Sequence, residues 1–127
     1  MLDPKVETSP TILIVEDEFL LRELVVEHLR EAGWNVLEAA SGEQALAHLA
    51  KAKIDVIFTD IRLEGDMNGW DLAEAGRERI ADLPVIYTTG QSINPPRPVS
   101  GSILLQKPYA PSQVERTSRE LVSARYG

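Results

Sequence analysis

Five short apolar segments recur along the chain, and each has the length of a β-strand. They cover residues 11–15, 34–39, 55–59, 84–88 and 102–106. In the first and third segments the runs ILIV and VIF are apolar at every position, without alternating polar residues. Such runs are typical of strands that are covered on both faces in a parallel sheet.

Helical patterns lie between most of these segments. Apolar residues recur at threes and fours over residues 21–29, ahead of Gly33, which suits a helix end. Residues 72–80 show similar spacing and predict a helix after Asn68 and Gly69. Capping-box patterns predict two further helix starts, at Ser41 with Gln44 and at Ser112 with Glu115.

The alternation of strand and helix predicts an α/β fold with a doubly wound, five-stranded parallel sheet. One connection breaks the pattern, because residues 91–101 contain three prolines, which oppose a continuous helix. We therefore expect the fourth helix to be degraded or replaced by a proline-rich loop. The domain is expected to cover residues 10–127, with a loose tail over residues 1–9.

The composition of the chain excludes several classes of function. The 20 acidic and 13 basic residues give a net charge of -7, which argues against direct binding to nucleic acid. The absence of cysteine excludes a disulfide framework and a thiolate metal site. We find no membrane span and no apolar leader, so we expect a cytoplasmic protein without a membrane partner.

Charged and hydroxyl side chains follow the predicted strands. Glu16 and Asp17 end the first, Asp60 the third, Thr89 the fourth and Lys107 the fifth. A strand order of 2-1-3-4-5 would bring the three carboxylates together, because the carboxyl ends of parallel strands share one edge. Two charges about 4 Å apart repel by about 1 kcal/mol in water and about 4 kcal/mol at an effective dielectric near 20. A carboxylate-rich site of this kind suits Mg²⁺.

Four motifs in this order resemble the receiver domains of response regulators. They are the acidic pair in ILIVEDE, the aspartate that ends IDVIFTD, the threonine before glycine in PVIYTTG, and Lys107-Pro108. The resemblance covers residues 11–124 and implies a flavodoxin-like fold of strand order 2-1-3-4-5. It also implies that Asp60 accepts a phosphoryl group from a phosphohistidine on a sensor histidine kinase or phosphotransfer protein. Signalling would then proceed through protein–protein contacts.

The resemblance assigns roles to further groups. Magnesium would be held by Glu16, Asp17, Asp60 and the backbone carbonyl of Arg62. Thr89 and Lys107 would bind the phosphoryl oxygens, and Lys107-Pro108 would be a cis peptide bond. The side chains of Arg62 and Gln91 would flank the path of the hydrolytic water and set the lifetime of the acyl phosphate.

The sequence also departs from the family pattern. Glu64 stands where a proline is common, and Leu104 replaces the aromatic that usually acts as a switch together with Thr89. The YTTG motif resembles a phenylalanine-alanine-threonine-glycine subclass of often free-standing receivers. We therefore hypothesise that residues 91–101 form the switch, loose when Asp60 is free and ordered when Thr89 engages a phosphoryl group.

Other readings remain open at this point. A phosphohydrolase of the haloacid-dehalogenase type would place its nucleophile after the first strand in an aspartate-x-aspartate pair, where Glu16-Asp17-Glu18 stands here. A flavin binder would need a hydroxyl-rich and glycine-rich loop at that place, and the acidic loop argues against it. The chain could also be a pseudo-receiver used as a binding module, or the receiver segment of a hybrid histidine kinase. The sequence leaves a homodimer open.

Overall fold

The computed structural model describes residues 9–91 and 95–126. The predicted loose tail lies outside the described residues except for Ser9. The elements in chain order are β1 (Thr11–Val15), α2 (Phe19–Glu31), β2 (Asn35–Ala39), α3 (Gly42–Lys51), β3 (Val56–Asp60), α4 (Gly69–Arg79), β4 (Val85–Thr89), β5 (Ile103–Gln106) and α5 (Pro111–Tyr126).

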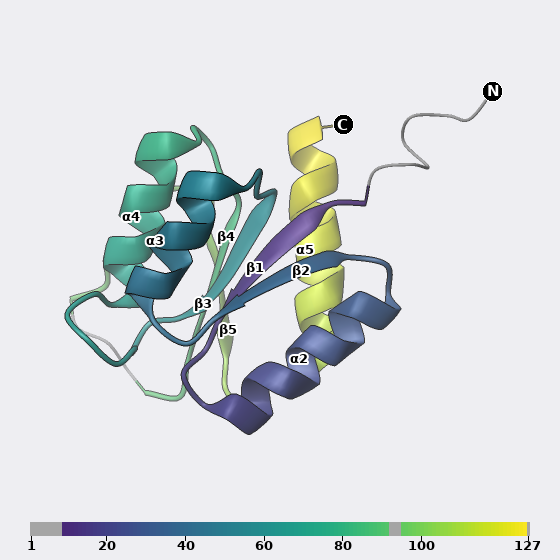
Figure 1. Ribbon diagram of the computed structural model, residues 1–127, viewed down its shortest axis with the longest axis horizontal. Coiled ribbons are helices and arrows are strands. Elements are labelled where there is room, and N and C mark those ends of the chain that lie inside the picture. Colours follow the sequence, from purple (N-terminus) through teal and green to yellow (C-terminus); the bar gives the residue numbers. More distant parts are fainter. Residues whose placement is uncertain (1–8, 92–94, 127) are drawn as a thin grey trace.

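The strands form one parallel sheet in the order β2-β1-β3-β4-β5, as predicted. Helices α3 and α4 cover one face, and α2 and α5 cover the other (Figure 1). The order reverses between β1 and β3, where the chain first winds to one side of β1 and then to the other. In open α/β sheets, ligands bind beyond the carboxyl ends of the strands at such a reversal. None of the described helices is long and apolar enough to cross a membrane.

The burial of strand β1 on both faces explains why its residues are apolar at consecutive positions. Ile12 and Ile14 belong to the core under α2 and α5, whereas Leu13 and Val15 belong to the core under α3 and α4. All four side chains are fully buried. Successive side chains of a strand point to opposite faces, so a strand between two helical layers must be apolar throughout.

Two helix starts have side-chain caps. The Ser41 hydroxyl accepts a hydrogen bond from the Gln44 amide at 3.1 Å, as the sequence predicts. Asn68 and Asp71 form a reciprocal capping box at the start of α4, with distances of 2.9 and 3.1 Å. These caps fix where α3 and α4 leave the edge of the sheet that carries the acidic residues.

The capping box predicted for the last helix is wrong. Helix α5 begins one residue before Ser112, which therefore lies inside the first turn. The Gln113 side chain accepts from the Ala110 amide at 2.7 Å, and Glu115 accepts from the Trp34 indole at 3.0 Å. The carboxylate of Glu115, which the local pattern assigned to a helix cap, thus binds the indole of the distant Trp34.

In its described part, the connection between β4 and β5 contains no helix, as expected from its prolines. Residues 95–102, which we call the β4–β5 segment, contact β4 and α4. The Val99 amide donates to the Tyr87 hydroxyl at 3.1 Å, and Arg77 donates to the Ser100 carbonyl at 2.8 Å. Arg97 forms ion pairs with two acids of α4. The hypothesis that this segment becomes more ordered when Thr89 engages a phosphoryl group stays a prediction.

Two large apolar residues of strand β5 are exposed, Ile103 at 38% and Leu104 at 52%. Ile103 pairs in register with Ile86, so it lies on the face of the sheet that α2 and α5 cover. Leu104 pairs in register with Tyr87, so both side chains lie on the face of the sheet that α4 only partly covers. The aromatic packing on this face comes from β4, where the Tyr87 ring meets Trp70 edge to face at 4.6 Å.

Gly69, the first residue of α4, lies against the backbone that follows β3. A Cβ atom at this position would lie 2.4 Å from the carbonyl oxygen of Asp60 and 2.8 Å from the Cα of Ile61. Because these are backbone atoms, a side-chain rotation cannot relieve the contact. We expect Gly69→Ala to lower the free energy of unfolding by about 1–3 kcal/mol, measured by urea denaturation.

Gly90 is the matched control, because a Cβ there would meet only the Lys107 side chain, at 3.8 Å. We expect Gly90→Ala to change stability by less than about 0.5 kcal/mol. Equal effects of the two substitutions would show that the close approach of α4 to Asp60 is not a packing constraint.

Candidate functional site

The candidate site lies at the carboxyl edge of the sheet, where backbone hydrogen bonds continue just past the strands. The Glu16 amide donates to Ala39 at 3.1 Å, and the Lys107 amide donates to Thr89 at 3.0 Å. Asp60 is the last residue of β3. Since the sheet holds these backbones in place, the side chains have little freedom to separate.

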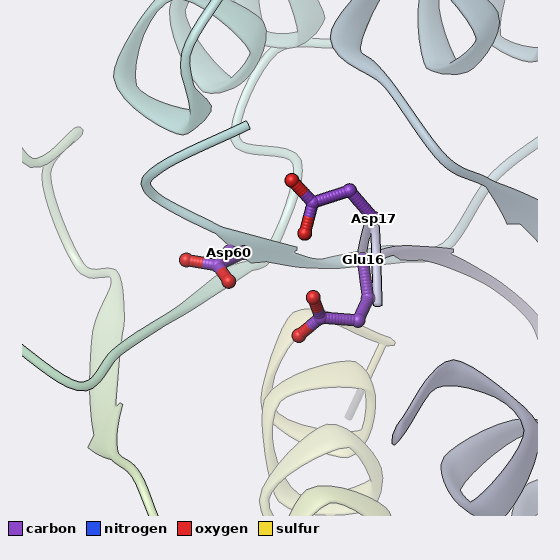
Figure 2. Close-up of side chains that lie close together, drawn as sticks. All are labelled: Glu16, Asp17 and Asp60. Carbon is purple, nitrogen blue, oxygen red and sulfur yellow. The ribbon is translucent and has the colours of Figure 1, made fainter. Parts of the chain in front are cut away.

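Three carboxylates meet at this edge, those of Glu16, Asp17 and Asp60. One oxygen from each lies within 4.8 Å of one oxygen from each of the others. Figure 2 shows the two β1-end side chains beside Asp60. Glu16 and Asp60 are only 1% and 6% exposed, and Asp17 is half-buried. Burial lowers the screening of their charges, so this cluster is electrostatically costly without a counter-charge.

Lys107 supplies one positive charge. Its Nζ lies 2.7 Å from Asp60 Oδ2 and 3.1 Å from Glu16 Oε1. Burial alone would lower the pKa of this lysine, but the contacts with Asp60 and Glu16 outweigh burial and raise the pKa. The ammonium group therefore stays charged at neutral pH. The peptide bond from Lys107 to Pro108 is cis, as the family resemblance implied.

Glu16 is the most deeply buried acid of the cluster. Burial raises the pKa of Glu16, and a hydrogen bond from the Glu18 amide at 3.1 Å opposes this shift only in part. Oxygen Oε1 is fully buried and lies 3.1 Å from Lys107 Nζ, an ammonium group that it shares with Asp60. Buried carboxylate oxygens that share one ammonium group fit coordination to a hard cation such as Mg²⁺.

The other site residues predicted from the sequence lie around this cluster. The Arg62 amide donates to Asp60 Oδ1 at 3.1 Å, and its side chain is exposed. The Thr89 hydroxyl donates to the Gln91 carbonyl at 3.0 Å and accepts from the Gln91 amide at 3.2 Å. Leu104 lies farther along the edge strand with its side chain exposed to solvent.

Three residues near the site were not predicted from the sequence. Gly69 allows α4 to approach Asp60, and Arg22 contacts the backbone of Glu16. Tyr109 packs edge to face against Phe58, and its buried hydroxyl has no hydrogen-bond partner in the part of the chain that the structure describes. Burial, together with the nearby acids, raises the pKa of Tyr109. The position of Tyr109 directly after the lysine-proline pair was a signal that could have identified it.

The chain matches a known protein family. The family model of the response regulator receiver domain matches residues 12–98, which is more than half of the chain. This chain belongs to the response regulator receiver family. The chain is therefore a signalling domain, and its acidic cluster lies at the carboxyl ends of β1 and β3.

Individual relatives agree with this assignment. The chain is 32% identical over 116 residues to a probable transcriptional regulatory protein, TcrX, of Mycobacterium tuberculosis, covering 88% of this chain and 49% of TcrX. It superimposes with a TM-score of 0.88 and 32% identity on a response regulator receiver protein from Sinorhizobium medicae, covering 94% and 98% of the two chains. The chain spans about half or less of the length of the curated relatives it matches.

A second solved structure shares the fold at lower identity. The receiver domain of the sensor histidine kinase PA1611 from Pseudomonas aeruginosa superimposes with a TM-score of 0.79 and 23% identity, covering 91% of this chain and 99% of that domain. That domain was solved with a magnesium ion coordinated in its active-site cleft.

Charge repulsion within the cluster gives a testable consequence for Asp17. Lys107 pairs with Glu16 and Asp60, and no ion pair to Asp17 occurs within the described residues. We expect Asp17→Asn to raise the free energy of unfolding in EDTA by about 1 kcal/mol, because it removes one repelling charge. In Mg²⁺ the order should reverse, since only the wild type gains the stabilisation of metal binding, RT ln(1 + [L]/Kd).

Thermal and urea unfolding with and without Mg²⁺ measure both effects. Glu18→Gln is the control, because this exposed acid is next in the loop but lies outside the cluster. An Asp17→Asn variant that is destabilised in EDTA, or that keeps the full Mg²⁺ effect, would count against a shared cation site.

Proposed function

We propose that this receiver domain accepts a phosphoryl group on Asp60 from a phosphohistidine and thereby switches its contacts with other proteins. The single observation that carries the proposal is the convergence of Glu16, Asp17 and Asp60 at one edge of the sheet, where Lys107 is the only cation that pairs with them among the described residues. Three negative charges and one positive charge leave an excess of negative charge. A divalent cation can neutralise this excess and so allow a phosphoryl group to bind.

The groups proposed to hold Mg²⁺ are Glu16, Asp17, Asp60 and the backbone carbonyl of Arg62. Bound there, the ion would neutralise charge on the phosphoryl oxygens, which the carboxylates alone would repel. The burial of the Glu16 carboxylate, which shares its one ion-pair partner with Asp60 among the described residues, supports this set. The donors are all oxygens, as Mg²⁺ prefers.

The reaction asks this chain mainly for positioning. A bond forms between an Asp60 carboxylate oxygen and phosphorus, the P–N bond of the phosphohistidine breaks, and the electron pair returns to the imidazole nitrogen. Lys107, already within 2.7 Å of Asp60, would then bind a phosphoryl oxygen. The Thr89 hydroxyl would exchange its bonds with Gln91 for another phosphoryl oxygen. Self-catalysed transfer and hydrolysis are the only catalysis that we propose.

The donor is proposed to dock on helix α2. Three large apolar residues at its amino-terminal end are exposed, with Phe19 at 58%, Leu20 at 71% and Leu24 at 58%. This end of α2 follows the acidic loop directly, so a helix packed there would carry its histidine close to Asp60. The partner class is a sensor histidine kinase or a histidine phosphotransfer protein.

The output remains part of the proposal. Thr89 and Leu104 are the proposed switch residues, and Leu104 has no polar group with which to change partners. Tyr87 lies two residues before Thr89 on the same face of β4 and binds the β4–β5 segment through Val99. Movement of Thr89 toward a phosphoryl group would therefore act on this docked segment. The same site would serve a free-standing cytoplasmic regulator, a homodimer or the receiver segment of a hybrid kinase.

The acceptor is tested by intact-mass analysis after incubation with acetyl phosphate and Mg²⁺. We expect the wild type to gain the mass of one phosphoryl group and Asp60→Asn to gain none, because the amide is not a competent nucleophile. The control is Asp66→Asn, which changes an exposed aspartate in the loop after β3 and should label like the wild type. Undiminished labelling of Asp60→Asn would exclude Asp60 as the acceptor.

The lifetime of the acyl phosphate is proposed to depend on Arg62 and Gln91, whose exposed side chains border the site. Arg62→Ala should shorten the half-life about fivefold, which corresponds to about 1 kcal/mol of barrier, because water then reaches the phosphorus more easily. Loss of the mass increment over time measures this rate. Glu64→Ala, in the same loop, should leave it unchanged, and a longer half-life in Arg62→Ala would show that Arg62 does not screen the site.

A further inference from the structure

Arg22 of helix α2 joins two parts of the molecule beside the acidic cluster. Its Nη1 donates to the backbone carbonyl of Glu16 at 2.8 Å, and its Nε donates to Glu38 Oε1 on β2 at 3.1 Å. The side chain is only 14% exposed, and the guanidinium carbon lies 5.5 Å from the centre of the Phe19 ring. The guanidinium group is thus fixed by the carboxylate of one strand and by the aromatic ring of its own helix.

The contact from Arg22 restrains the backbone carbonyl of Glu16, while the amide of the same residue is held by the sheet. The Glu16 amide already donates to the Ala39 carbonyl at 3.1 Å, and Arg22 takes the opposite end of the same residue. The side chain of Glu16 accepts from the Glu18 amide, which closes the turn that contains Asp17. Without Arg22, only one backbone hydrogen bond among these would hold Glu16 to the sheet.

The turn needs such a restraint because its side chains repel Asp60. Each pair of charges about 4 Å apart costs about 1–4 kcal/mol, depending on the local dielectric. The metal-free turn can lower this energy by moving Glu16 and Asp17 away from β3. A restraint on the carbonyl of Glu16 opposes that movement without adding a ligand to the site.

We propose that Arg22 is a positioning residue for magnesium, which keeps Glu16 and Asp17 in the binding arrangement before the ion arrives. The inference rests on the Mg²⁺ site of the proposed function and adds a residue outside the ligand set. Groups that orient metal ligands are commonly worth 10-fold to 100-fold in affinity. The guanidinium group serves here because its planar fork can bind two acceptors at once, whereas an ammonium group is a single point charge.

The direction in which Mg²⁺ affinity changes when Arg22 is replaced distinguishes a positioning role from a purely electrostatic one. Arg22 is a cation beside a cation site, so removing its charge would by itself strengthen Mg²⁺ binding. Loss of positioning would weaken it. Arg22→Met removes the charge and the donors but keeps an unbranched apolar side chain over Phe19.

Arg30 provides the matched control on the same helix. Its Nη2 lies 3.7 Å from Glu38 Oε2, so it pairs with the same carboxylate as Arg22. Its side chain is 55% exposed, and its one hydrogen bond is to the Val36 carbonyl, away from the acidic turn. Arg30→Met therefore removes an equal charge from the same ion-pair network without touching Glu16.

Isothermal titration with Mg²⁺ measures the dissociation constants of the wild type, Arg22→Met and Arg30→Met. We expect Arg22→Met to bind about 10-fold more weakly and Arg30→Met to bind within about 2-fold of the wild type. In EDTA, hydrogen exchange at the amides of Asp17 and Glu18 should be faster in Arg22→Met alone. Urea unfolding shows whether each variant is folded under these conditions.

Glu38→Gln is the second variant, for use if Arg22→Met does not fold. It weakens the anchor of the guanidinium group on β2 and should raise the Mg²⁺ dissociation constant severalfold. Equal or tighter binding by a folded Arg22→Met, or equal losses in Arg22→Met and Arg30→Met, would overturn the positioning role. Failure of the wild type to bind Mg²⁺ would overturn the metal site of the proposed function, and the inference with it.

Discussion

The mutual repulsion of three carboxylates at one edge of the sheet is the constraint on which the rest of the site depends. Glu16, Asp17 and Asp60 would separate in a flexible chain, but here Asp60 ends β3 and Glu16 directly follows β1, and both strands are hydrogen-bonded and buried on both faces. The stability of the apolar core therefore offsets the cost of the charges. This repulsion favours cation binding, because a bound ion removes an unfavourable energy that the stability of the core already offsets.

Strand order decides which residues share this edge. The reversal between β1 and β3 places the acidic turn beside Asp60, and the β4–β5 pair brings Lys107 in from the other side. The lysine pairs with two acids and leaves the third without an ion pair among the described residues. The site thus keeps a net negative charge after pairing with the lysine. That charge suits a domain that binds a divalent cation together with a phosphoryl group.

The sequence predicted the features that depend on local patterns, and it missed those that depend on distant pairs. The apolar runs gave the strands, and parallel strands bring their carboxyl ends together, so Asp60 and Lys107 could be placed in advance. Glu115 could not be assigned correctly, because its partner Trp34 is 81 positions away. Likewise the prolines after β4 excluded a helix, but nothing local indicated that Tyr87 would bind Val99. The contact from Arg22 to Glu16 was hidden because it uses a backbone carbonyl.

The central claim is that the acidic cluster binds a phosphoryl-like group on Asp60 only together with a divalent cation. Fluorine NMR of the protein with beryllofluoride, a phosphoryl mimic, tests it directly. The account predicts bound fluoride resonances in the presence of Mg²⁺, none in EDTA, and none in Asp60→Asn under either condition. Bound resonances that persist in EDTA, or none in the wild type with saturating Mg²⁺, would contradict it.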